Sequence, residues 1–246
     1  MPFILLLPLL LGALAGCQRP NSQDDSTAAQ SDASDPFAAA RRRMISEQLS
    51  ARGIADKAVL AAMSRVPRHR FVPELYRTDA YADHPLPIGF DQTISQPYIV
   101  AYMTEAARMS KDDKVLEVGT GSGYQAAILA ELAAQVYTIE IIPELAAGAR
   151  TVLGELGYRN VEVRTGDGYA GWKEHAPFDA IVVTAAPDHV PQALIDQLAI
   201  NGRMIIPVGT GAQEMRVITK TETGVTQEST LSVRFVPLVR SDTSKR

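Results

Sequence analysis

A glycine-rich run and two acidic side chains are spaced as they would be around a small polar ligand. The run Gly119–Gly123 (GTGSG) directly follows the apolar stretch KVLEV, and Glu140 lies 21 residues after the first glycine. Glycines allow positive φ angles and close approach of the backbone to a ligand. An acid placed like Glu140 accepts hydrogen bonds from ribose hydroxyls. With Asp167 in the later stretch TGDG, these residues predict a site for a nucleoside-containing cofactor.

Other interpretations of these residues need to be weighed. Taken alone, the glycine run could be a tight strand-to-helix turn without a ligand. Its G-x-G-x-G spacing differs from the G-x-G-x-x-G of dinucleotide-binding loops. Tyr169 and Lys173 have the Tyr-x-x-x-Lys spacing of short-chain dehydrogenases, but Gly171 lies between them and they follow the glycine run too closely. A binding protein that holds a nucleoside without turning it over is the alternative from another class.

Alternating strands and helices must position these residues. Continuous apolar runs such as AIVV and MII are typical of parallel strands covered by helices on both faces. The expected strands are 114–118, 136–140, 161–165, 178–185 and 203–208, and the expected helices between them are 124–134, 143–156 and 191–199. Since parallel strands place their carboxyl ends at one edge, Gly119, Glu140 and Asp167 should surround a single crevice.

The two ends of this region differ from its centre. Apolar spacing and Asp56 as an N-cap predict helices over 41–50, 56–66 and 97–109, while 215–221 and 230–239 resemble antiparallel edge strands. The expected fold is therefore a doubly wound, mostly parallel, Rossmann-like α/β domain. It has a helical N-terminal cap and antiparallel C-terminal edge strands.

Composition excludes several classes of protein. The chain has 246 residues, 46% of them hydrophobic, and a formal net charge of −4. This balance is typical of a globular protein and argues against a basic nucleic-acid binder. The single cysteine excludes an internal disulfide framework and a cysteine-built zinc site. The four histidines are scattered without the spacing of a metal pair, so we expect no metal site.

The stretch around the glycine run resembles the first motif of class I S-adenosylmethionine-dependent methyltransferases. It reads VLEVGTGSGY from Val115 to Tyr124. In that family an acid ending the second strand binds ribose and an acid after the third contacts adenine, positions that match Glu140 and Asp167. After the fourth strand the chain has Thr184-Ala-Ala-Pro instead of the Asp/Asn-Pro-Pro-aromatic motif of enzymes that methylate bases. We therefore expect no nucleic-acid acceptor.

A second set of motifs resembles protein-L-isoaspartate O-methyltransferases, over about residues 41–240. These motifs are VPR with FVP (66–73), LPIG (86–89), QTISQPY (92–98), GDG (166–168) and VRFVPL (233–238). The resemblance implies transfer of a methyl group from S-adenosylmethionine to the free carboxylate of L-isoaspartyl residues in damaged proteins and peptides. The ester then closes to a succinimide, which opens partly to normal aspartate.

The resemblance also assigns roles to residues. Ser95 is the expected active-site residue, its hydroxyl orienting the acceptor carboxylate; alternatively, Ser95 caps the helix that begins near Pro97, and both can hold. No role is carried over to Val239, where some relatives have a threonine that reaches the cofactor. Since a carboxylate is ionised at neutral pH, no general base is needed. The expected cofactor contacts are Thr93, Gly119, Thr120, Gly121, Ser122, Gly123, Glu140, Asp167 and Gly168.

The amino terminus predicts export. Residues 3–16 form an apolar run too short to span a bilayer, followed by Cys17 in the stretch LAGC. This resembles the lipobox of bacterial lipoprotein precursors; the alternatives are a misassigned start or an uncleaved apolar tail. We divide the chain into a signal peptide (1–16), a polar tether (17–40), a methyltransferase domain (41–240) and a tail (241–246). A lipid anchor at Cys17 would place it at the periplasmic face, whereas relatives are usually cytoplasmic.

Overall fold

The structure, a computed structural model, describes residue 1 and residues 35–240. The expected signal peptide beyond Met1, Cys17, most of the tether and the tail 241–246 therefore lie outside the described residues. The chain divides into two units, Met1–Ala38 and Ala39–Arg246. All elements discussed below belong to the second unit, apart from the first residue of helix α2.

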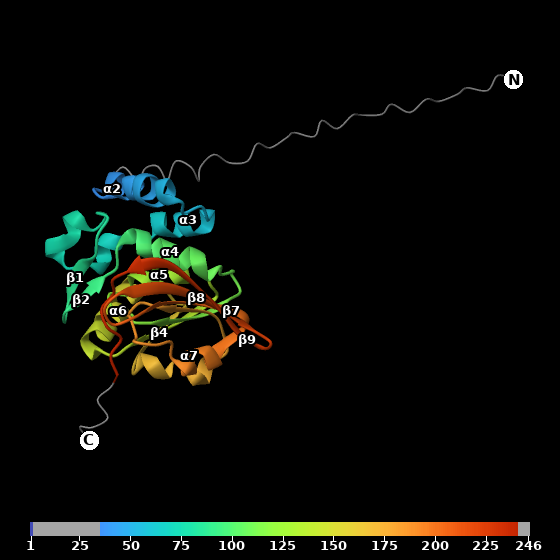
Figure 1. Cartoon of the computed structure of the whole chain (residues 1–246). Helices are drawn as coiled ribbons and strands as arrows, with labels where there is room; N and C mark the ends of the chain where they lie inside the picture. Colours follow the sequence, from blue (N-terminus) through green and yellow to red (C-terminus); the bar gives the residue numbers. More distant parts are fainter. Residues whose placement is uncertain (2–34, 241–246) are drawn as a thin grey trace. The chain divides into compact units, whose positions relative to one another are not determined.

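A seven-stranded sheet forms the centre of this unit (Figure 1), with the strand order β5-β4-β3-β6-β7-β8-β9. Strands β3 to β7 pair in parallel, while β8 pairs antiparallel with both β7 and β9. The expected doubly wound, mostly parallel sheet with antiparallel C-terminal strands is confirmed. The strands are β3 (Lys114–Val118), β4 (Gln135–Glu140), β5 (Val161–Thr165), β6 (Phe178–Val183), β7 (Leu198–Val208), β8 (Gln213–Thr221) and β9 (Gly224–Val233).

Helices cover the sheet and form the N-terminal cap. Figure 1 shows α4 and α5 on one face of the sheet and α7 on the other. The cap comprises α2 (Ala38–Arg43), the π-helix η1 (Met44–Leu49), η2 (Ser50–Arg52), α3 (Lys57–Arg65), η3 (Arg68–Phe71) and η4 (Glu74–Asp79). The remaining helices are α4 (Pro97–Ala107), α5 (Tyr124–Ala130), α6 (Pro143–Glu155), η5 (Gly168–Ala170), η6 (Lys173–His175) and α7 (Gln192–Gln197). Within residues 35–240, no helix combines the length and apolar character needed to cross a membrane.

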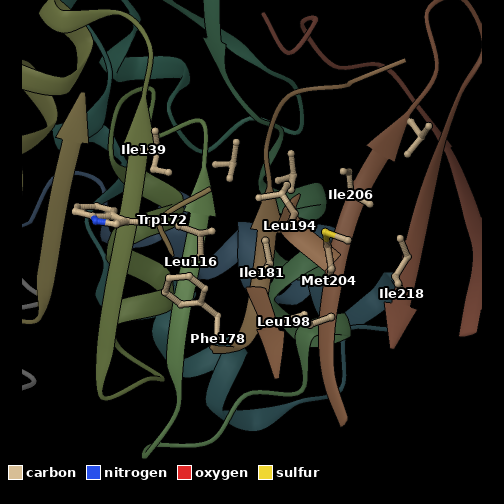
Figure 2. Close-up of a cluster of buried hydrophobic side chains, with 13 residues drawn as sticks. Leu116, Ile139, Trp172, Phe178, Ile181, Leu194, Leu198, Met204, Ile206 and Ile218 are labelled. Carbon is tan, nitrogen blue, oxygen red and sulfur yellow. The ribbon is translucent and has the colours of Figure 1, made fainter. Parts of the chain in front are cut away.

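The core explains why the central strands have apolar residues on both faces. Strand β6 contributes Phe178, Ile181 and Val183 to a buried cluster that continues into β7 through Met204 and Ile206 (Figure 2). Each of these side chains is fully buried. Because helices cover both faces of a parallel sheet, its strands carry continuous apolar runs instead of alternating ones. This rigid centre holds the loops at the strand ends.

The predicted elements differ from the structure mainly at the C-terminal edge. A strand was expected over 230–239, but β9 covers Gly224–Val233, and Pro237 makes only an isolated bridge to Ala186. The reason is a tight turn, since Thr221 already pairs with Gly224 and fixes the register of β9 immediately after β8. The expected helix over 124–134 ends at Ala130.

A small hairpin was not expected from the sequence. Strands β1 (Leu86–Gly89) and β2 (Gln92–Ile94) pair antiparallel before α4. The turn places Phe90 and Asp91 at positive φ, 52° and 56°. Two prolines near β1 hide the strand pattern in the sequence, because proline is depleted in strands. The hairpin supplies one wall of the site described next.

Candidate functional site

A pocket lies at the carboxyl ends of β3, β4 and β6. At β3 the strand order changes direction, since β4 lies on one side of it and β6 on the other. Such a switch point is where open α/β sheets bind ligands. The pocket volume is about 810 Å³ including its open mouth. Its walls are the segments Gln92–Ser95, Glu117–Ser122, Ile139–Ile142 and Val236–Val239, with Val100, Tyr124, Gln125, Gly168, Thr184 and Ala185.

The glycine loop has the backbone geometry expected of a ligand cradle. Gly119, Gly121 and Gly123 have positive φ angles of 100°, 52° and 87°. The amides of Gly119 and Thr120 both donate to the carbonyl of Ile139, at 2.8 and 3.2 Å, which ties the loop to β4. A Cβ at Gly119 would collide with the Thr184 hydroxyl. The loop therefore needs glycine where the backbone turns beneath the pocket.

Glu140 lies at the end of β4 and is 5% exposed. Its Oε2 accepts a hydrogen bond from the amide of Gly121 at 2.8 Å, and its Oε1 accepts one from the amide of Ile142 at 3.0 Å. Each carboxylate oxygen has a second lone pair available. Glu140 thus fixes the glycine loop and can still accept hydrogen bonds from a ligand in the pocket.

Glu117, to which the sequence assigned no role, also lines the pocket. It is fully buried in β3, where its Oε2 accepts a hydrogen bond from Thr138, whose hydroxyl lies 2.6 Å from that of Thr120. Its Oε1 has no partner among the described residues. Burial, together with the charge of Glu140, raises the pKa of Glu117 to about 8. The available signal was an acid inside an apolar strand, where an unpaired charge is costly.

The predicted residues after β5 divide into two groups. Gly168 lines the pocket, and a Cβ there would collide with Val118. Asp167 precedes it, and its Oδ1 accepts a hydrogen bond from the amide of Tyr169 at 2.9 Å, which caps η5. Neither Asp167 nor Gly123 is among the residues that line the pocket. Asp167 therefore adjoins the pocket through Gly168.

Ser95, directly after strand β2, also lines the pocket, as does Thr93 in that strand. Helix α4 begins at Pro97 with Gln96 as its N-cap, so Ser95 is not the capping residue. Its backbone carbonyl accepts a hydrogen bond from Nη2 of Arg68 at 2.7 Å. Among the described residues, its hydroxyl has no hydrogen-bond partner and is available to a ligand.

A second hollow meets the pocket at Ser95. Thr93, Ser95, Thr184 and Val236 line both. The second hollow continues along Ser232–Phe235, at the end of strand β9 and just beyond it. It also passes Gln96, the N-cap of α4, and Ile99 in the first turn of that helix. Ser95 therefore lies between the pocket at the glycine loop and an open groove along extended backbone, an arrangement that can bring two different ligands together.

The side chains present limit the chemistry of the site. Within the described part of the chain, no group of three or more histidine, cysteine, aspartate or glutamate residues could hold a metal ion. The described pocket walls include no histidine or cysteine that could act as base or nucleophile. The site can bind a nucleoside and align a second ligand at Ser95, which suits reactants that are already activated.

Comparisons with known proteins agree with this geometry. Residues 40–243 match the family model described as protein-L-isoaspartate(D-aspartate) O-methyltransferase. A protein-L-isoaspartate O-methyltransferase of Gloeobacter violaceus is 64% identical over 199 residues, 80% of this chain and 97% of the relative. One of Picosynechococcus is 60% identical over 83% of this chain and 92% of the relative.

Two solved structures show the same fold. A protein-L-isoaspartate O-methyltransferase superimposes with a TM-score of 0.74 at 29% identity, covering 80% of this chain and 65% of that one. A protein described as a putative protein-L-isoaspartate O-methyltransferase from Plasmodium falciparum, in complex with S-adenosyl-L-homocysteine, gives a TM-score of 0.71 at 27% identity. The match covers 82% of this chain and 99% of that chain.

Proposed function

Because the chain belongs to the protein-L-isoaspartate O-methyltransferase family, we propose that its pocket binds S-adenosylmethionine and presents the methyl group to an acceptor held at Ser95. The acceptor is the free carboxylate of an L-isoaspartyl residue in a damaged protein. Methylation converts that carboxylate into an ester. The neighbouring backbone nitrogen attacks the ester carbonyl, methanol leaves, and the resulting succinimide is hydrolysed partly to normal aspartate. The observation that carries the proposal is the position of Ser95 between the pocket and the groove.

The residues present fit S-adenosylmethionine. Glu140 has lone pairs for the ribose hydroxyls, and the glycines at 119 and 168 let the backbone pack closely on Thr184 and Val118 at the pocket, which a Cβ would prevent. Glu117 lines the same pocket, and its buried Oε1 has no partner among the described residues. When bound, S-adenosylmethionine supplies a methyl group already activated by its sulfonium. The chain's own residues therefore need to hold the two reactants, orient them toward each other and shield them from water.

The acceptor side needs no general base. The carboxyl group of an isoaspartyl residue has an ordinary pKa near 4, so it is ionised and nucleophilic at neutral pH. We assign to the Ser95 hydroxyl the role of donating a hydrogen bond to this carboxylate and aiming one oxygen at the methyl group. Alignment of this kind contributes much of the acceleration when both reactants are already activated.

The direct test is transfer of labelled methyl groups. The purified chain is incubated with labelled S-adenosylmethionine and a peptide containing one L-isoaspartyl residue, with the same peptide containing normal aspartate as the control. We expect base-labile label on the isoaspartyl peptide only. Cofactor binding without transfer would favour a nucleoside-binding protein, and equal labelling of both peptides would contradict the assigned specificity.

We also propose that the chain is exported and anchored by lipid at Cys17, facing the periplasm. Support comes from the apolar run 3–16, the stretch LAGC and the polar segment that follows. The family match begins at residue 40, after this segment. Buried acyl chains each contribute about 0.8 kcal/mol per methylene, so two or more would anchor the domain stably.

The mature protein's mass and its fractionation in the native host test this location. We expect a lipid-modified Cys17 at the start of the mature chain, and loss of membrane association in Cys17→Ser. A protein that retains residues 1–16 and fractionates with the cytoplasm would contradict export, as would one that begins near Met44.

A further inference from the structure

Arg68 is a fully buried cation outside the pocket walls. It begins the short helix η3 in the N-terminal cap. Burial lowers the pKa of Arg68 to about 10, so its guanidinium remains charged at neutral pH. Arginine is rarely fully buried unless it is paired. Its partners in the described chain therefore indicate what the buried charge does.

The guanidinium donates to two backbone carbonyls instead of forming an ion pair. Nε donates to the carbonyl of Ala80 and Nη2 to the carbonyl of Ser95, each at 2.7 Å. No carboxylate in residues 35–240 forms a salt bridge with it. Hydrogen bonds from a charged donor are roughly twice as strong as neutral ones. The charge of Arg68 therefore holds the backbone of Ser95 itself.

The same guanidinium contacts the donor side of the site. It lies over the ring of Tyr124, with its carbon 4.8 Å from the ring centroid. Tyr124 is 1% exposed, begins α5 directly after the glycine loop and lines the pocket. One rigid, buried group thus contacts both the segment that carries Ser95 and the helix that follows the glycine loop.

We propose that Arg68 is a positioning residue for methyl transfer, which fixes Ser95 relative to the glycine loop. The proposal rests on the role assigned to Ser95 above. In-line transfer requires the acceptor oxygen to be aligned with the methyl group, and a displacement of about 1 Å can cost about 100-fold in rate. The planar guanidinium suits this role because it can donate in two directions while its face stacks on a ring.

The first test is Arg68→Lys, which keeps the charge but loses the planar fork. We expect kcat for an isoaspartyl peptide to fall about tenfold to hundredfold, with the affinity for S-adenosylhomocysteine within about threefold of the unsubstituted chain. The matched control is Phe71→Leu, because Phe71 is buried in the same short helix and its ring lies 5.5 Å from that of Tyr124. Among the described residues, Phe71 makes no hydrogen bond to the Ser95 carbonyl, which accepts one from Arg68.

Phe71→Leu should lower the melting temperature of the protein while leaving kcat within about threefold of that of the unsubstituted chain. An equal loss of kcat in both variants would overturn the proposal, because it would indicate general loosening of the cap. The proposal would also be overturned if the loss of activity in Arg68→Lys were explained entirely by weaker cofactor binding.

A double-mutant cycle separates this proposal from the role of Ser95. If Arg68 acts through Ser95, Arg68→Lys should lower kcat much less in a Ser95→Ala background than in the unsubstituted chain. Fully additive losses would overturn the role of Arg68 and leave that of Ser95 intact. A silent Ser95→Ala would instead contradict the role of Ser95, and Arg68 would then have no serine hydroxyl to position.

Discussion

The two sides of the pocket are held together in different ways. On the donor side, the glycine loop is fixed by the neighbouring strand β4, through the carbonyl of Ile139 and the carboxylate of Glu140. On the acceptor side, Ser95 follows a two-stranded hairpin and its carbonyl is bound by Arg68, 27 residues away in sequence. The donor side is therefore built by the sheet itself, and the acceptor side by side chains from the cap. Substitutions should affect cofactor binding on one side and methyl transfer on the other.

The largest effect on the donor side is expected from Gly119→Ala. The residue has a φ of 100°, and the added Cβ would collide with Thr184. Strain at such a position costs on the order of 1–3 kcal/mol before the collision is counted, so we expect affinity for S-adenosylmethionine to fall at least about 100-fold by calorimetric titration. The matched control is Gly148→Ala in helix α6, where a Cβ meets nothing within 4 Å. It should bind normally and gain about 0.5–1 kcal/mol of stability.

Glu140→Ala should weaken S-adenosylmethionine binding by about 1.5–3 kcal/mol, the range for hydrogen bonds to a charged group. The carboxylate holds the amide of Gly121 and has lone pairs for the ribose. Calorimetric titration measures the change, with Glu144→Ala, an exposed acid in the first turn of α6, as the control. Unchanged affinity in a folded Glu140→Ala protein would contradict the role assigned to Glu140 in binding the ribose.

Ser95→Ala tests the acceptor side. We expect kcat/KM for an isoaspartyl peptide to fall about tenfold or more, because a hydrogen bond to a charged carboxylate is worth about 1.5–3 kcal/mol. Cofactor affinity should stay nearly unchanged, since Glu140 and the glycine loop remain. The melting temperature should also change little, because Gln96 and not Ser95 occupies the N-cap of α4. Wild-type kcat/KM would show that the hydroxyl has no role.

The last effect concerns the pH dependence of stability, and not binding or methyl transfer. The pKa of Glu117 is raised from 4.5 to about 8 by burial. The folded chain therefore binds a proton that the unfolded chain releases between these values, and this contribution to the free energy of unfolding falls as pH rises through that window. Glu117→Gln should not show this loss of stability. The difference in melting temperature, variant minus unsubstituted chain, should therefore increase from pH 5 to pH 8.

Thermal melts without cofactor measure this difference. The control is Glu162→Gln, which removes an exposed acid from β5. Protonation of Glu117 in the folded state would be contradicted if the difference in melting temperature between Glu117→Gln and the unsubstituted chain stayed constant with pH.

The contrast between the two sides also explains what the sequence could predict. The strand ends that carry Gly119, Glu140 and Gly168 follow from apolar runs and a glycine motif, all of which are local signals. The hairpin before Ser95 could not be predicted in this way, because its register depends on pairing of Leu86 with Ile94 and on a turn with positive φ at Phe90.

Two other features leave no periodic pattern in the sequence. The start of β9 is set by a turn at Thr221, and the buried contacts of Arg68 join segments that no periodicity connects. Glu117 differs from both, because an acid within KVLEV was visible in the sequence. Complete burial gives that acid its importance, and burial follows only from the packed sheet.

The most direct test of the account is a crystal structure with S-adenosylhomocysteine and an isoaspartyl peptide. We predict ribose hydroxyls at the Glu140 carboxylate, sulfur facing Ser95, and the peptide extended along Ser232–Phe235 with its free carboxylate at the Ser95 hydroxyl. A peptide carboxylate bound away from Ser95, or sulfur directed away from the groove, would contradict the claim that the two sides of the pocket meet at this serine.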